Sequence, residues 1–94
     1  MKSIISNSNE CYFCSRTGDL HKLHVIFGTA NRKKADEDGL WVKLCPGCHH
    51  AIHNPSNDFD RWMGKALKEV AQERWEQRNG SRDEFIERYG KSYL

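Results

Sequence analysis

The sequence lacks any apolar stretch long enough to cross a membrane, which excludes the integral membrane proteins built from helices. A transmembrane helix needs about 20 consecutive apolar residues, whereas only 37% of the 94 residues are hydrophobic and 30% are charged. The first ten residues, MKSIISNSNE, also lack the apolar core of a secretory signal peptide. We therefore expect one small domain in the cytoplasm, where disulfide bonds are rare.

A strong charge of one sign is also missing, because the formal net charge is only +2. Such a sum does not by itself indicate a nucleic-acid partner. The placement of the cations is more informative, since five of them lie between residues 21 and 44. If this segment folds onto one face, it offers several phosphate-binding groups, and the alternative is a solvated lysine-rich loop. The five are Lys22, Arg32, Lys33, Lys34 and Lys43.

Four cysteines form two Cys-x-x-Cys pairs, Cys11/Cys14 and Cys45/Cys48. Two thiolates in one tight turn can reach the same ion, and two such turns complete the tetrahedral shell that Zn²⁺ favours. Disulfide bonds, free thiols and a thioredoxin-like redox pair are the alternatives. The absence of secretion and βαβ signals makes each of them less favourable. The spacing predicts a structural zinc site.

The chain divides into three parts by composition. Residues 1–10 are polar, and we expect them to be flexible. Residues 11–54 form a module that contains the four cysteines and all five histidines. Residues 55–94 are expected to be a helical support. We predict the small α+β fold class, with a zinc-stapled core and C-terminal helices.

Two short strands and one short helix are expected within this module. Residues 23–27 and 40–44 are runs of aliphatic and aromatic residues next to glycine, as strands often are. The connection between them, residues 28–39, is polar and long for a hairpin, so it is expected to be a functional loop. Residues 49–53 are expected to be a short helix that ends before Asn54-Pro55.

The last third of the chain has the apolar spacing of amphipathic helices. Between residues 59 and 77, apolar side chains recur at steps of three and four, which places them on one stripe. A second helix is predicted to begin at the capping box Ser81-x-x-Glu84. We interpret both as packing supports, and we expect Trp41 to be buried rather than to stack on a base. The stripe is Phe59, Trp62, Met63, Ala66, Leu67, Val70, Ala71 and Trp75.

The histidines decide the functional interpretation. His21 and His24 are three residues apart, so on a regular strand they point to opposite faces and only one can face a shared site. We favour His24, because it leads into the apolar run. His49 and His53 are one helical turn apart and can bind one metal ion together, whereas His50 points elsewhere. The alternative for each is an ordinary polar side chain or a substitute zinc ligand.

Together these residues carry a resemblance to a known family. The order Cys11-x-x-Cys14, His24-Val25-Ile26, a loop and then Leu44-Cys45-x-x-Cys48-His49 resembles the zinc-containing HNH nucleases of the ββα-metal (His-Me finger) class. The whole chain is similar to small phage-encoded HNH proteins, including the recombination-enhancement, RecA-dependent nucleases. The resemblance implies a ββα-metal fold, cleavage of DNA in a bacterial host cell, and a RecA-type recombinase filament as a partner.

The resemblance also implies roles for individual residues. His24 would be the general base, His49 a ligand of a catalytic divalent ion, and Asn31 the middle residue of the motif. This chemistry suits phosphodiester hydrolysis, which needs a deprotonated water and a cation at the phosphate. The ion would be Mg²⁺, Mn²⁺ or another divalent ion.

Two positions depart from the family pattern. Leu23 stands where many members have an Asp or His ligand, so His53, or His21 on an irregular strand, is the candidate replacement. Without a carboxylate such as Asp36 or Asp38, softer ions than magnesium are favoured. Asn31 lies closer to the predicted base than the motif requires. It would either orient the ring of the base or fix the loop by backbone hydrogen bonds.

Two other functions fit the same sequence. A zinc knuckle with a basic loop can hold nucleic acid without cutting it, and the leucine at the expected ligand position favours this alternative. The amphipathic segment 59–77 can instead dock on a protein partner of a phage or a recombination system, with zinc serving only the fold.

Overall fold

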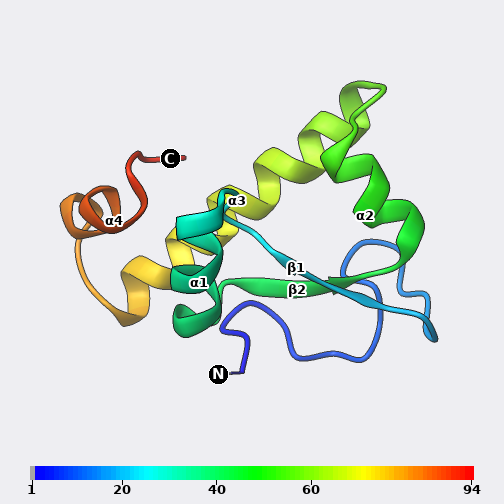
Figure 1. The fold of residues 1–94 in the computed structure, drawn as a ribbon, viewed down its shortest axis with the longest axis horizontal. Helices are drawn as coiled ribbons and strands as arrows, with labels where there is room; N and C mark the ends of the chain where they lie inside the picture. The colour runs from blue at the N-terminus through cyan, green and yellow to red at the C-terminus, as the bar shows by residue number, and fades with distance from the viewer. Residues whose placement is uncertain (1) are drawn as a thin grey trace.

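The computed structural model describes residues 2–94, which form a two-stranded sheet and four helices (Figure 1). Along the chain they follow in the order β1, α1, β2, α2, α3 and α4. The model therefore has a small α+β architecture. Within residues 2–94, no helix combines the length and the apolar character needed to span a membrane. The bounds are β1 His21–His24, α1 Thr29–Asp38, β2 Trp41–Leu44, α2 Pro46–His53, α3 Asp58–Arg78 and α4 Arg82–Tyr89.

The two strands pair antiparallel, with Leu23 opposite Val42 and His21 opposite Leu44. Because side chains alternate along a strand, these four share one face of the sheet. The three aliphatic members are at most 3% exposed and lie in the core. The other face carries Lys22 and His24. The strand β1 begins two residues earlier than predicted.

A helix, α1, replaces the loop predicted between the strands. Among its ten residues only Ala35 is buried, so the segment has almost no apolar periodicity from which a helix could be recognised. Residues of good helix propensity follow Gly28, and Gly39 ends the helix in the left-handed conformation, with φ at 74°. A side chain at Gly39 would also collide with the carbonyl oxygen of Lys2, 2.5 Å from the ideal Cβ position.

The segment expected to be flexible, residues 1–10, packs against the sheet within its described part. Ile4 is 7% exposed and belongs to the core. Its amide donates to the carbonyl of Gly39 at 2.9 Å, and the hydroxyl of Ser3 donates to the carbonyl of Trp41 at 2.6 Å. One apolar anchor and these backbone bonds hold a segment whose composition alone indicates disorder.

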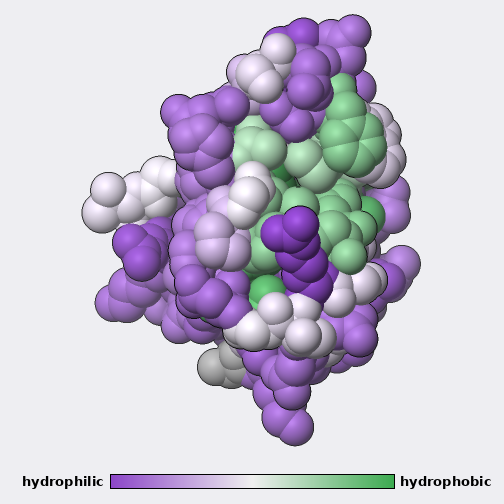
Figure 2. Space-filling model, turned by 90° about the vertical axis from the view of Figure 1, so that its right-hand side faces the viewer, coloured by the Kyte–Doolittle hydropathy of each residue, from purple (hydrophilic) through white to green (hydrophobic). Residues whose placement is uncertain are grey.

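The two C-terminal helices form as predicted, and the Ser81 capping box is present. On α3 the stripe members Met63, Leu67, Ala71 and Trp75 are buried, and the ring of Trp75 contacts Phe85 of α4 with 5.5 Å between centroids. Its first members differ from the prediction, because Phe59 and Trp62 are 61% and 55% exposed. They lie in the first turns of α3, and their rings stack at 5.7 Å. Figure 2 shows that the face at the right-hand side of Figure 1 carries a hydrophobic patch.

Asp38 joins the end of α1 to the C-terminal helices. Its carboxylate accepts hydrogen bonds from the indole of Trp75 at 2.8 Å, the hydroxyl of Tyr89 at 2.6 Å and the guanidinium of Arg88 at 2.6 and 3.0 Å. Burial, together with this carboxylate, raises the pKa of Tyr89. One side chain therefore ties three helices together.

Candidate metal centre and histidine pocket

The four cysteines, predicted as one site, come together. Their sulfur atoms all lie within 4.8 Å of one another, and the Cys14 and Cys45 sulfurs are 3.6 Å apart. Four sulfurs around a zinc ion at 2.3 Å would be about 3.8 Å apart. The cluster could therefore hold a metal ion such as zinc. Within residues 2–94 no other group of three or more His, Cys, Asp or Glu has ligand atoms this close.

Two local structures present these thiols. The first pair lies on a tight turn, in which the amide of Ser15 donates to the carbonyl of Cys11 at 3.0 Å and Ser15 has a positive φ of 63°. The second pair opens helix α2, where Cys45 is the N-cap and its sulfur accepts from the amide of Cys48 at 3.4 Å. Pro46 suits the first helical position, because its missing N–H has no helical acceptor there.

Two of the four thiols, those of Cys11 and Cys45, have a lowered pKa. Burial raises the pKa of Cys11, but amides of the cysteine turns and of Phe13 outweigh it and bring this pKa to about 6. The amide of Cys48 lowers the pKa of Cys45, whereas burial and the neighbouring sulfurs raise the pKa of Cys48. Thiolates packed so closely repel one another, and a divalent cation would relieve that repulsion.

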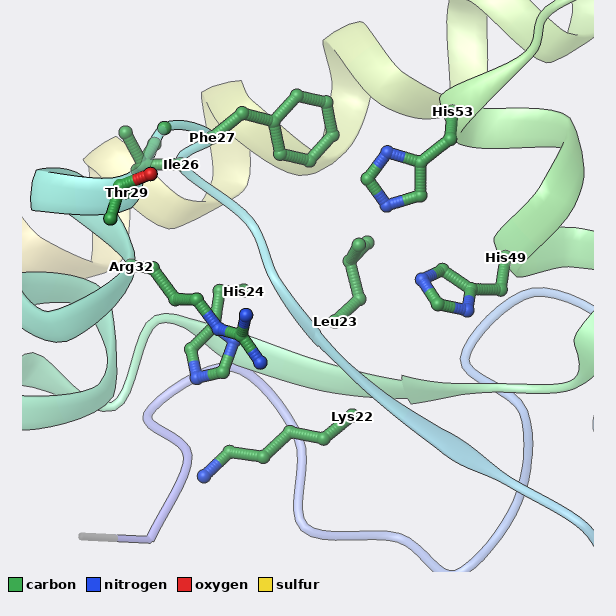
Figure 3. A pocket seen from close by; sticks show the side chains of 10 residues that line it. Lys22, Leu23, His24, Ile26, Phe27, Thr29, Arg32, His49 and His53 are labelled. Atoms are coloured by element: carbon green, nitrogen blue, oxygen red, sulfur yellow. The ribbon is translucent and has the colours of Figure 1, made fainter.

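A pocket of about 510 Å³ adjoins β1 and the C-terminal part of α2. It is lined by His24, Arg32, His49 and His53, among others. Figure 3 shows that the two histidines of α2 lie on one side of β1, together with Leu23, and that His24 lies on the other. The pocket therefore wraps around the strand. The three histidines predicted to surround one pocket, His24, His49 and His53, all line it, but they do not form a cluster with ligand atoms as close as those of the cysteines.

His21, considered from the sequence as an alternative metal ligand, lies beside His49. The Nδ1 atoms of His21 and His49 are 3.0 Å apart, because His21 shares the strand face that looks toward α2. Nitrogen ligands in adjacent octahedral positions, each about 2.1 Å from an ion, lie about 3.0 Å apart. The pair could hold a divalent ion, and the same distance also suits an N–H···N hydrogen bond.

The third histidine of this group, His53, also lies close to His49, but the three do not form a cluster with ligand atoms as close as those of the cysteines. The ring of His53 stands edge-on to that of His49, with 4.9 Å between centroids, and stacks on Phe27 at 4.9 Å. Burial, followed by the charges of His53 and His21, lowers the pKa of His49. A neutral imidazole is the form that binds a metal.

His24 is held by a carboxylate that the sequence prediction did not assign to it. Its Nε2 lies 3.1 Å from Oδ1 of Asp36 on α1, and Lys22 forms an ion pair with the same oxygen. Lys22 and then His24 lower the pKa of Asp36 to about 2. Because an ionised carboxylate only accepts, the neutral form of this ring would carry its proton on Nε2 and leave Nδ1 as an acceptor.

Asn31, predicted as a catalytic residue, does not contact His24. Its side-chain amide donates to the carbonyl of Phe27 at 3.1 Å and so fixes the turn before α1. Of the two roles considered for Asn31, this contact corresponds to fixing the backbone by a hydrogen bond. Asp36, which lies about one and a half turns further along α1 than Asn31, takes the position beside the ring. Because residues 28–39 were predicted to be a loop, the sequence analysis did not apply helical spacing to Asp36.

The five cations predicted to bind nucleic acid are spread over more than one surface. Arg32 lines the histidine pocket, and with Lys33 and His24 it lines a smaller hollow beside it. Two of the other cations have structural partners instead. Lys34 donates to the carbonyl of Arg88 at 2.8 Å, and Lys43 donates to Asn9 at 2.7 Å. Lys22 lines the histidine pocket, but its ammonium group forms an ion pair with the carboxylate of Asp36.

Comparison with known proteins identifies no relative of this chain. No family model matches it, and neither a curated protein nor a solved structure matches it. What the two sites do is therefore inferred from their own geometry and chemistry.

Proposed function

We propose that this protein is a metal-dependent HNH-type endonuclease of the ββα-metal class, which hydrolyses phosphodiester bonds in DNA. One observation carries the proposal. A histidine held by a carboxylate, His24, and an imidazole that can bind a metal, His49, line one pocket on opposite sides of β1 (Figure 3), and His21, the first residue of β1, lies 3.0 Å from His49. An arginine, Arg32, lines that pocket and suits a phosphate.

In this proposal the cysteine cluster holds a structural Zn²⁺. The sulfur spacing and the partly ionised thiols support it. The cluster connects the turn at residues 11–14 to the beginning of α2. That turn is also anchored to β2, since the amide of Tyr12 donates to the carbonyl of Lys43 at 2.9 Å. Zinc would therefore fix the direction in which α2 presents His49 and His53 to β1.

The arrangement around β1 suits an in-line displacement at phosphorus, in which the attacking and leaving oxygens lie on opposite sides. His24 accepts the proton of the attacking water at Nδ1, while Asp36 holds the proton on Nε2. Arg32 binds a non-bridging phosphate oxygen. His21 and His49, which lie 3.0 Å apart, would hold a divalent ion. When bound, that ion supplies positive charge to the scissile phosphate and the leaving oxygen.

The ligand set favours particular ions. Two imidazoles are available, Leu23 contributes no ligand, and Asp36 is engaged by Lys22 and His24. Imidazole ligands suit manganese, nickel or zinc better than magnesium, which prefers oxygen ligands. We therefore expect faster cleavage with Mn²⁺ or Ni²⁺ than with Mg²⁺. The resemblance further suggests a RecA-type filament as a partner, and adding such a filament to the assay tests this.

The experiment measures cleavage of supercoiled plasmid and of single-stranded oligonucleotides, with and without each added ion. His24→Ala should reduce the rate by about 10²–10⁴-fold, the usual contribution of a general base, and should leave DNA affinity and zinc content unchanged. His50→Ala is the matched control, because His50 is an exposed histidine on the same helix as His49. Cleavage by the His24 variant at an undiminished rate would refute the assignment.

Two observations favour other functions. Leu23, in place of a ligand, faces the α2 histidines, which suits a protein that holds nucleic acid without cutting it. DNA retention without cleavage under any of the ions selects that function. The exposed rings of Phe59 and Trp62 suit a docking surface for a protein partner. An assay that shows neither retention of DNA nor cleavage would select that alternative.

A further inference from the structure

A second pocket, of about 490 Å³, adjoins the histidine pocket at Phe27, which lines both. Its walls are the end of α2, one face of α3 and residues 91–94. None of the cations that the sequence predicted to bind nucleic acid lines it. We call it the Lys68 pocket, after the lysine of α3 that lines it between Phe27 and Tyr93.

Among the charged side chains that line the Lys68 pocket, the cations outnumber the anions. Four carry a positive charge and one, Asp60, carries a negative charge. That carboxylate is 9% exposed, and it already accepts hydrogen bonds from the amide and hydroxyl of Ser56 at 3.0 and 3.1 Å. The cations therefore dominate the open part of the pocket. They are Arg61, Lys65, Lys68 and Lys91.

Two of these cations have no counter-ion in the part of the chain that the structure describes. Neither Lys68 nor Lys91 has a carboxylate within 4.0 Å. Their ammonium groups lie over aromatic rings instead. The Nζ atom of Lys68 is 4.4 Å from the ring centroid of Phe27, and that of Lys91 is 5.1 Å from the centroid of Tyr93.

The surroundings of Lys68 disfavour its charged form. Burial and then the charge of Lys91 lower the pKa of Lys68. A bound anion would offset both effects, because it replaces lost hydration and separates two like charges. The aromatic contacts compensate the burial only in part, since a cation over a ring gains less than an ion pair with hydrogen bonds.

We infer that the Lys68 pocket binds a backbone phosphate of the same nucleic-acid strand whose scissile phosphate enters the histidine pocket. This inference rests on the proposed function for the strand in the first pocket. A strand, rather than a separate phosphate ion, is favoured because the two hollows share Phe27 as a common wall. A polyanion can reach Arg32 on one side of that ring and Lys68 on the other.

The test measures affinity for a labelled ten-nucleotide single strand, without added divalent ion so that nothing is cut. Lys68→Gln/Lys91→Gln should weaken binding roughly five- to tenfold and reduce the salt slope of the affinity by about 1. Lys2→Gln/Arg78→Gln removes the same charge from exposed positions elsewhere and is the matched control. A dinucleotide, too short to span both pockets, should bind the two double variants equally.

A second pair of variants leaves the lysines in place. Gly64 lines the pocket, and a Cβ atom there would meet no atom within 4 Å. Glutamate and glutamine have the same size, and both favour the helix over glycine. Gly64→Glu adds a negative charge to the pocket and should weaken binding of the ten-nucleotide strand. Gly64→Gln, of the same size but neutral, should not.

The outcomes separate the inference from the proposed function. Equal affinities of the lysine variant and its control, or of the two Gly64 variants, overturn the inference whether or not the protein cuts DNA. Nuclear magnetic resonance of the Lys68 side chain is the second readout. A shift on addition of the strand supports the inference. A shift with inorganic phosphate but none with the strand overturns it. Failure to cut DNA, with binding still sensitive to Lys68, refutes only the nuclease.

Discussion

The exposed cysteine, Cys14, offers a clean test of the proposed zinc ion. Replacing its sulfur by oxygen in Cys14→Ser changes one ligand atom at an exposed position and leaves the buried core untouched. If no metal is bound, such a surface substitution should change the free energy of unfolding by no more than about 0.5 kcal/mol. If zinc is bound, the variant loses one of four thiolate bonds. The two cases therefore predict different magnitudes.

The expected loss of stability in Cys14→Ser follows from the usual contribution of a structural zinc site. A structural zinc site contributes about 10–16 kcal/mol in small metal-dependent folds, which is about 2.5–4 kcal/mol for each of four ligands. A domain of this size loses about 4–8 °C of melting temperature per kcal/mol. The variant should therefore melt about 10–30 °C below the wild type. That loss is a large share of the stability of a small domain.

The assay is thermal unfolding followed by circular dichroism, with zinc content measured by elemental analysis of the same samples. We expect one zinc per wild-type chain. In excess chelator the wild type and Cys14→Ser should become equally unstable, because neither then holds the ion. A variant within about 0.5 kcal/mol of the wild type in zinc-containing buffer would refute the reasoning.

Three further predictions concern the described contacts. Asp38→Ala should destabilise the fold by about 3 kcal/mol, because it leaves hydrogen-bond donors of α3 and α4 without their shared acceptor; Glu37→Ala, which removes one exposed contact, should cost under about 1 kcal/mol in the same denaturant titration. Phe85→Ala, at a fully buried ring, should cost about 3–5 kcal/mol by chemical unfolding. Since the pKa of Asp36 is lowered to about 2, this carboxylate stabilises the fold above its ordinary pKa, and that contribution should fade as the pH drops from about 4 through 2. Carboxyl chemical shifts measure its titration, and a midpoint near 4 would contradict the ion pair with Lys22.

Local patterns in the sequence predicted several elements of the fold correctly. The helices α3 and α4 follow from apolar spacing and from the capping box at Ser81, because both signals involve residues within a few turns of one another. The helical spacing of His49 and His53 was predictable for the same reason. The cysteine cluster was predictable from the short spacing within each pair, since the number and type of the ligands indicate a common ion.

The helix α1 was not predictable from the same signals. It is almost entirely polar, and only Ala35 enters the core, so no stripe marks it. Its absence from the prediction had a consequence for the site. The resemblance implied a catalytic role for Asn31 as the only asparagine in the expected loop, whereas helical geometry brings Asp36 to the ring of His24.

The sequence by itself determined which residue types were available: four thiols in two turns, five imidazoles around them, and amphipathic helices that supply the core. Only the tertiary structure decided which imidazoles meet. Alternation along β1 separates His21 from His24 in any register, but the side that faces α2 depends on how the sheet packs against the helices. That packing buries Leu23 and Val42 in the core, and it carries His21 to within 3.0 Å of His49. Contacts between residues 28 positions apart depend on the burial of the whole core, which no local pattern encodes.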